Sequence, residues 1–167
     1  MIRAHLIVPC LLTCSALSAQ TPNLIEAAEY EPTANRWFIS NGSSILETDN
    51  GGVSYEYFGS GSATHGMEVI DGYLFAIGNN IVRAYDLQTA ELAGTIAIPG
   101  SGFLNGMGSR SGELVISDFA NGKLHRVDIS NPANMTTEVL VNATGTTPNG
   151  VVTVSYTHLR AHETVAN

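Results

Sequence analysis

The chain has 167 residues, of which 44% are hydrophobic and only 13% charged, and its 7 basic and 15 acidic side chains give a net charge of −8. An ordinary soluble domain has about 25% charged residues. This much apolar material excludes a disordered acidic tail. Seven dispersed Lys and Arg residues cannot form a phosphate-binding stripe, so we expect no nucleic-acid partner. The 17 glycines, with few long helix formers, favour β-structure with many turns.

The first twenty residues have the composition of a secretory signal peptide. Arg3 and His5 precede the apolar run LIVPCLLTCSALSA, which ends in small residues, and this order is typical of an export signal. The run is too short to span a bilayer comfortably, so no transmembrane segment is expected. Both cysteines, Cys10 and Cys14, lie inside it. We therefore expect residues 1–20 to be a signal peptide, and the mature protein to be secreted, periplasmic or at the cell surface.

Three stretches of the chain repeat one pattern, and they lie at 37–49 (WFISNGSSILETD), 74–86 (LFAIGNNIVRAYD) and 114–128 (LVISDFANGKLHRVD). Each begins with a short β-branched or aromatic run, breaks at a polar turn, and resumes as an alternating strand that ends in Asp. The Asn-Gly pairs that begin at Asn41 and Asn121 predict β-hairpins with type I′ turns, in which both central residues have positive φ.

A second set of repeated residues indicates the same repeating unit. The pair Gly66-Met67 recurs as Gly106-Met107, and Gly150-Val151 begins another round, at spacings of 40 and 44 residues. Each round contains one further strand-like stretch, which gives about four strands per repeat of about 40 residues, the period of a propeller blade. Blades that stack around an axis bury both faces of each sheet. The alternative that fits the turn spacing is a β-sandwich.

The predicted fold class is therefore all-β, an incomplete β-propeller of about three four-stranded blades from a six-bladed ring. Closed propellers have at least four blades, so residues 21–154 fill only part of a ring, and we expect the chain alone to be inactive. The blades are expected at about 25–64, 65–104 and 105–148, with the next blade beginning at 149–154.

The last thirteen residues, 155–167, leave the repeat pattern where an apolar strand is expected. Their core, SYTHLRAHET, is similar to a peptide that recurs at the ends of unrelated translated sequences, and we interpret the segment as a non-native tail from assembly or read-through. His158 and His162 have the spacing of a metal-binding pair on a helix. Because no third ligand is positioned by the sequence, we expect no function for them.

Three segments resemble the senescence marker protein/gluconolactonase/luciferin-regenerating enzyme family. The first, EAAEYEPTANRWFIS, resembles the start of that family's first blade, a Glu-Gly-Pro-x-Trp-x-Pro pattern: Glu26 stands at the acidic position, Tyr30 at the aromatic one and Pro32 at the proline. Ala27-Ala28 replace the Gly-Pro pair. FLNGMGSRSGELVISD resembles the family's Arg-x-Asn-Asp-Gly segment, and TPNGVV resembles its Asn-Gly-Leu segment.

The resemblance implies a divalent cation on the propeller axis and metal-dependent hydrolysis of a lactone or related ester. The family's cation ligands are a Glu, an Asn and an Asp. Glu26 and Asn149 match the first two, and the Asp has no counterpart in this chain. Asn105 matches a substrate-binding Asn, while Phe103 replaces the Arg before it. Carboxylate and amide oxygens suit Ca²⁺, with Zn²⁺ as the alternative. Catalytic residues are not assigned.

Each of these residues also has a purely structural interpretation. Glu26 is otherwise a solvated residue near the start of the mature chain, whereas Asn105 and Asn149 are otherwise loop or turn residues beside glycine. Asp118 either faces the axis or caps a turn. His65 either reaches the axial channel or is a hydrogen-bonded turn residue.

The aspartates that end the repeated hairpins, Asp49, Asp86 and Asp128, are expected to bond main-chain amides of the following turns. The alternative function is a non-catalytic secreted propeller that binds carbohydrate or protein at its rim loops, because one fold hosts many functions. The sequence leaves the choice between this binder and the hydrolase open, and it does not define an oligomeric state.

Overall fold

The computed structural model describes residues 20–49, 51–155 and 158–163. Nearly all of the predicted signal peptide, residues 1–19, lies outside them. The only helix in the described part is a short 3-10 turn, η1 (Pro132–Asn134), which Asn131 caps by accepting a hydrogen bond from the main chain of Ala133. None of the described helical structure is long and apolar enough to cross a membrane.

Three sheets of four antiparallel strands follow one another along the chain, each in simple sequence order. The first consists of β1 (Ala28–Glu31), β2 (Arg36–Asn41), β3 (Ser44–Thr48) and β4 (Glu56–Tyr57). The second consists of β5 (Met67–Ile70), β6 (Tyr73–Gly78), β7 (Ile81–Asp86) and β8 (Leu92–Ala97). The third consists of β9 (Leu104–Arg110), β10 (Glu113–Asp118), β11 (Lys123–Asp128) and β12 (Thr136–Val141).

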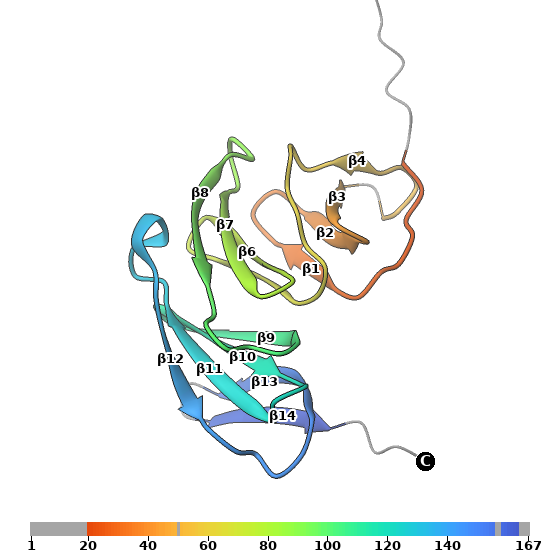
Figure 1. Cartoon of the computed structure of the whole chain (residues 1–167). Helices are drawn as coiled ribbons and strands as arrows, with labels where there is room; N and C mark the ends of the chain where they lie inside the picture. The colour runs from red at the N-terminus through yellow and green to blue at the C-terminus, as the bar shows by residue number, and fades with distance from the viewer. Residues whose placement is uncertain (1–19, 50, 156–157, 164–167) are drawn as a thin grey trace, which may run out of the picture.

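A two-stranded antiparallel sheet follows them, made of β13 (Pro148–Ser155) and β14 (His158–Glu163). The sheets are arranged side by side about a common centre, with β1, β9 and β13 toward it and β4, β8 and β12 toward the outside (Figure 1). The innermost strands are neighbours, because β5 contacts both β1 and β9, and β9 also contacts β13. The predicted architecture of three four-stranded blades is confirmed, and the β-sandwich alternative is wrong.

The second blade shows why blades need neighbours. Side chains alternate along β6, so Leu74 belongs to a core cluster shared with the first blade, whereas Phe75 and Ile77 belong to a cluster shared with the third. All three side chains are 0–1% exposed. In the first cluster, Phe58 packs edge-on against Phe38 with ring centroids 4.8 Å apart. One sheet therefore supplies apolar surface to two interfaces.

The hairpin turns differ in register from the sequence prediction. Asn41 pairs with Ser44, so the turn between β2 and β3 centres on Gly42 and residue 43, and only Gly42 has positive φ, at 68°. At the second Asn-Gly pair, likewise, only Gly122 has positive φ. The type I′ predictions at Asn41 and Asn121 are therefore wrong, because each Asn lies one position ahead of the glycine that carries the left-handed conformation.

A two-residue hairpin turn with positive φ at both central residues joins β5 to β6. There Ile70 pairs with Tyr73, and Asp71 and Gly72 have φ of 52° and 83°. Its Asp-Gly pair is a strong type I′ signal that our sequence interpretation did not use.

The C-terminal segment also differs from its prediction. The backbone of His158–Glu163 is an extended strand paired with β13. The helical spacing noted for His158 and His162 therefore does not apply, because four residues along a strand are not one turn apart.

Candidate ligand site at the entry face

Five of the residues that the sequence singled out lie at one end of the inner strands. The innermost strands β1, β5, β9 and β13 all begin at this end. Glu26 lies two residues before β1, His65 two residues before β5, and Phe103 one residue before β9, while Asn105 and Asn149 are the second residues of β9 and β13. We call the surface formed by these five residues the entry face.

In the part of the chain that the structure describes, the predicted ligands are held by their main chains and not by their side chains. The main-chain carbonyl of Asn105 accepts a hydrogen bond from the N–H of Gly66 at 2.9 Å, and that of Asn149 accepts one from Ser117 Oγ at 2.9 Å. Within the described residues, neither side-chain amide and no oxygen of the exposed Glu26 carboxylate makes a hydrogen bond. Both asparagines are half-buried and lie in strands, so the loop and turn interpretations of them are wrong.

Two buried serines position these residues. Ser40 and Ser117 occupy equivalent places in the repeat, and both are 0% exposed. Ser40 Oγ accepts hydrogen bonds from the main-chain N–H of Glu26 at 3.1 Å and of the following residue at 2.8 Å. Ser117 Oγ accepts one from Gly106 N–H at 2.8 Å while it donates to Asn149. The buried Ser40 hydroxyl therefore holds the segment before β1 in place, and the equivalent Ser117 hydroxyl links β9 and β10 to β13 by hydrogen bonds.

The repeated Gly-Met pairs of the sequence mark close contacts between inner strands. A Cβ on Gly106 would lie 2.5 Å from the carbonyl oxygen of Asn149 and 2.7 Å from Cα of Gly150. A Cβ on Gly66 would lie 2.8 Å from the main-chain nitrogen of Met107. Only glycine lets the inner strands approach this closely at the entry face.

His65 lies beside Glu26 and Phe103. Its Nδ1 is 2.9 Å from Thr64 Oγ1, and its ring meets that of Phe103 edge to face, with centroids 4.7 Å apart. Burial lowers the pKa of His65, although the negative charge of Glu26 acts in the opposite direction. The imidazole is therefore neutral at neutral pH, and His65 is both a hydrogen-bonded residue and part of the entry face.

Asp118 caps a turn and does not face the axis. It is fully buried, and its carboxylate accepts hydrogen bonds from the N–H groups of Gly102 and Phe103 at 3.0–3.2 Å and from Asn121 Nδ2 at 2.8 Å. His125 Nε2 lies 3.4 Å away. Burial by itself raises the pKa of Asp118, but the hydrogen bonds hold it below its ordinary value. The turn interpretation is confirmed.

Two of the three hairpin-ending aspartates cap turns as predicted. Asp86 Oδ1 accepts hydrogen bonds from the N–H groups two and three residues on, both at 2.9 Å, and Asp128 Oδ1 accepts one from the N–H two residues on, also at 2.9 Å. Main-chain hydrogen bonds lower the pKa of Asp86, and hydrogen bonds from the side chain and then the main chain of Ser130 lower the pKa of Asp128. The described residues show no such bond for Asp49. There the Thr48 hydroxyl accepts from Gly52 N–H at 3.3 Å.

A pair of glutamates farther along the inner strands was missed by sequence reasoning. Ser109 Oγ donates to Glu68 Oε2 at 2.7 Å, and the N–H of Val69 donates to Glu29 Oε1 at 3.4 Å. Burial raises the pKa of Glu68 to about 7 against the opposing hydrogen bond from Ser109, and the charge of Glu29 raises it further. Burial also raises the pKa of Glu29. The signal in the sequence is a Glu at the same place in two successive inner strands.

The donors at the entry face suit a hard cation in type. Glu26 offers a carboxylate and Asn149 an amide oxygen, and neither makes a hydrogen bond within the described ranges. Ca²⁺ prefers six to eight such oxygens, with water completing the set. Among the residues that the structure describes, no group of three or more His, Cys, Asp or Glu side chains could hold a metal ion. A cation at the entry face, held by Glu26 and Asn149, therefore stays a prediction.

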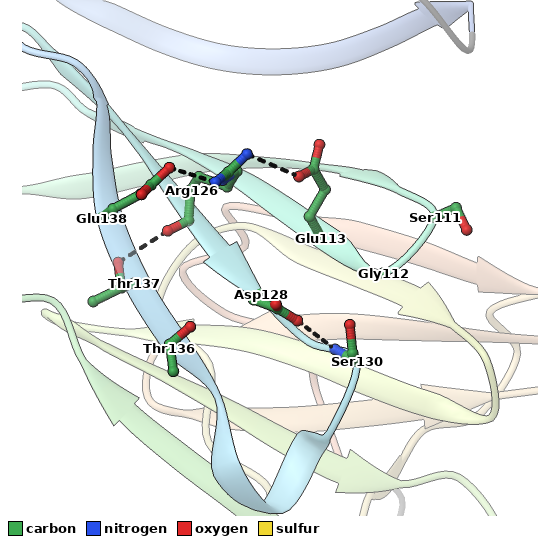
Figure 2. Close-up of a pocket in the computed structure, with 9 residues that line it drawn as sticks. All are labelled: Ser111, Gly112, Glu113, Arg126, Asp128, Ser130, Thr136, Thr137 and Glu138. Atoms are coloured by element: carbon green, nitrogen blue, oxygen red, sulfur yellow. Dashed lines mark hydrogen bonds and ion pairs between the residues drawn. The ribbon is translucent and has the colours of Figure 1, made fainter.

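A surface pocket of about 320 Å³ lies at the other end of the third blade. Figure 2 shows Arg126 between Glu113 and Glu138. Its Nη1 lies 3.7 Å from the Glu113 carboxylate, and its Nη2 lies 2.5 Å from that of Glu138. The Thr137 hydroxyl donates to the main-chain carbonyl of Arg126 at 3.1 Å. These partly exposed charges are paired across β10, β11 and β12, so they contribute to the sheet.

A larger cavity, of about 730 Å³, lies between the first two blades. Arg36 lines this cavity, and its guanidinium forms ion pairs with Glu31 at 3.2 Å and with Glu47 at 2.8 Å. Arg36 Nη2 also donates to the main-chain carbonyl of Leu87 in the second blade at 2.6 Å. Arg36 is therefore already committed to joining two blades, and the entry face remains the candidate site.

No family model matches the chain, and no curated protein matches it. Solved β-propeller structures resemble it in fold. A chain of the nidogen/laminin complex matches with a TM-score of 0.57 and 11% identity, over 77% of this chain and 52% of that one. The Cps50 (Swd1) β-propeller domain from Myceliophteria thermophila gives 0.57 and 13%, over 74% and 41%. A chain of the mitotic checkpoint complex gives 0.58 and 11%, over 91% and 50%.

These similarities confirm the propeller fold and nothing finer. The chain spans about half the length of the solved chains it matches, from 41% to 52%. The predicted all-β, incomplete propeller is thus confirmed, whereas the six-bladed ring and the gluconolactonase-like family stay predictions. Function must be argued from the entry face, because propellers of one architecture serve many functions.

Proposed function

We propose that the chain is part of an exported, gluconolactonase-like propeller whose entry face binds a divalent cation and a lactone or related ester. The observation that carries this proposal is that three polar side chains at one end of the inner strands make no hydrogen bonds within the described residues. Glu26, Asn105 and Asn149 lie at the same end of the inner strands, their main chains are anchored, and within the described residues their polar side-chain atoms make no hydrogen bonds. Anchored main chains with free polar ends suit ligand binding.

In this proposal Glu26 and Asn149 hold the cation, and Asn105 hydrogen-bonds the substrate. The oxygen donors favour Ca²⁺ over Zn²⁺, which prefers nitrogen and sulfur ligands. A bound cation polarises a lactone carbonyl and stabilises the charge that develops on its oxygen. Ser40 fixes the main chain at Glu26, and Ser117 fixes the carbonyl of Asn149, so both ligand positions are set by buried hydroxyls.

The test is calcium titration of the full chain by isothermal titration calorimetry. We expect Glu26→Gln to weaken calcium binding by at least about tenfold, because the variant loses the only carboxylate charge in the ligand pair. Glu56→Gln, which alters an exposed glutamate on β4, is the matched control and should bind like wild type. Unchanged calcium affinity in Glu26→Gln, or no calcium binding in the wild type, would refute the cation site.

A non-catalytic propeller that binds a protein is the second candidate. It is supported by the solved neighbours, two of which are chains of protein complexes. The calcium titration separates the two candidates, because a protein-binding rim does not require a cation held by Glu26. A wild-type chain that binds no calcium would favour this second function.

A further inference from the structure

Phe103 presents an exposed aromatic ring on a main chain that is fixed from both sides. Its N–H donates to Asp118 Oδ1 at 3.0 Å, and its carbonyl accepts from the N–H of Phe119 at 2.8 Å. The neighbouring Gly102 N–H is bound by the same buried carboxylate. Although its main chain is fixed, Phe103 is 40% exposed to solvent. A fixed main chain with an exposed ring is a preorganised contact surface.

Two further rings extend this surface. His65 meets Phe103 edge to face with centroids 4.7 Å apart and planes at 84°, and Phe119 does the same at 6.2 Å and 84°. Phenyl rings carry no charge, and the Asp118 carboxylate, which accepts the hydrogen bond from the Phe103 N–H, is itself buried and occupied by hydrogen bonds. We call these three rings, His65, Phe103 and Phe119, the aromatic patch.

The aromatic patch borders the polar part of the entry face. Asn105 follows Phe103 by two residues, and the charge of Glu26 acts on His65. Apolar and polar contacts therefore lie side by side at the start of the inner strands. A ligand that fits both has a polar group for the asparagines and Glu26, and an apolar part that covers the rings.

We propose that Phe103 is a specificity-determining residue of the entry face, and that the ligand is a neutral lactone or ester carrying an alkyl chain that packs on the aromatic patch. This inference rests on the proposed function. An alkyl chain gains free energy when it and the exposed ring leave water together. The hydroxyl groups of a sugar lactone would instead lose water without gaining partners from the phenyl rings.

The experiment compares two lactones that differ only in their alkyl chain, γ-valerolactone with a methyl group and γ-decalactone with a hexyl group. Dissociation constants are measured for the full chain by ligand-observed NMR, with EDTA present so that no cation contributes. We expect the wild type to bind γ-decalactone more tightly by about tenfold or more, because five further methylene groups are partly buried. Phe103→Ala should reduce this preference to near unity.

Tyr57→Ala is the matched control, because Tyr57 is an exposed aromatic residue on the outer strand of the first blade, 51% exposed. It should keep the wild-type preference. Phe103→Gln replaces the ring by a polar chain on the same main chain and should also abolish the preference, so it decides the question if Phe103→Ala does not fold. Equal affinity of the two lactones for the wild type, or a preference that survives both Phe103 variants, would overturn the inference.

The two proposals fail separately. Loss of the cation site appears in the calcium titration of Glu26→Gln, in which no lactone is present. Loss of the aromatic contact appears in the lactone comparison, in which EDTA removes any cation. A chain that prefers γ-decalactone through Phe103 but binds no calcium would retain the ligand contact and reject the metal-dependent function.

Discussion

Replacement of Glu68 by glutamine is expected to stabilise the protein in a pH-dependent way. Glu68 lies on the inner strand β5, where burial raises its pKa from 4.5 to about 7, with a further contribution from Glu29. A carboxyl whose pKa is raised by folding favours the folded state in its protonated form. Its contribution is therefore most favourable below pH 4.5 and is lost as the pH rises through 7.

The magnitude follows from the two pKa values. Each pH unit between 4.5 and about 7 is worth about 1.4 kcal/mol, so ionised Glu68 costs the fold about 3 kcal/mol at pH 8. At pH 5.5 the same relation gives about 1.4 kcal/mol. Glutamine is neutral at both pH values and keeps an oxygen that accepts the hydrogen bond from Ser109 Oγ. The stability advantage of Glu68→Gln should therefore grow by about 2 kcal/mol from pH 5.5 to pH 8.

The assay is urea unfolding followed by circular dichroism at pH 5.5, 6.5, 7.5 and 8.0, with Glu56→Gln as the exposed control. The lower limit keeps the protein above its isoelectric point of about 4.9. Wild type and control should lose stability together as the pH rises, whereas Glu68→Gln should lose less. The reasoning is refuted if the difference between Glu68→Gln and wild type stays constant with pH, or if the variant is less stable at pH 8.

Two further predictions concern the supports of the entry face. Asp118→Ala should lower the free energy of unfolding by about 2–4 kcal/mol, because it leaves the N–H groups of Phe103 and its neighbours without the buried carboxylate that accepts their hydrogen bonds; a loss below about 1 kcal/mol in urea unfolding would contradict this. Gly106→Ala should lower the melting temperature more than Gly108→Ala, because its new Cβ would meet the main-chain carbonyl of Asn149 at 2.5 Å, whereas that of Gly108 would first meet a side-chain methyl at 3.0 Å. Equal losses would show that the inner strands are free to separate.

Local sequence patterns determined the architecture. Alternation of side chains along 74–77 sends Leu74 to one neighbouring blade and Phe75 to the other, and the repeated polar turns divide the chain into hairpins. These features depend on residues close together in the chain, so their physical consequences can be read from spacing. The same reasoning placed the type I′ turns at Asn41 and Asn121 wrongly, because the pairing register that decides which residue takes positive φ is set across strands.

Contacts between residues of different blades could be recognised only from the tertiary structure. The repeat showed that glycine recurs at Gly66 and Gly106, but only the packing of β9 against β13 shows that a side chain at Gly106 would collide with Asn149. Likewise, Glu29 and Glu68 are ordinary strand glutamates in the sequence, and their raised pKa values arise because adjacent inner strands remove both from water. The sequence by itself determined the blade, a unit of local order. Only the assembled blades decided the burial of charges, the close approaches and the gathering of Glu26, Phe103 and Asn105 at one face, because these depend on contacts between segments about 40 residues apart.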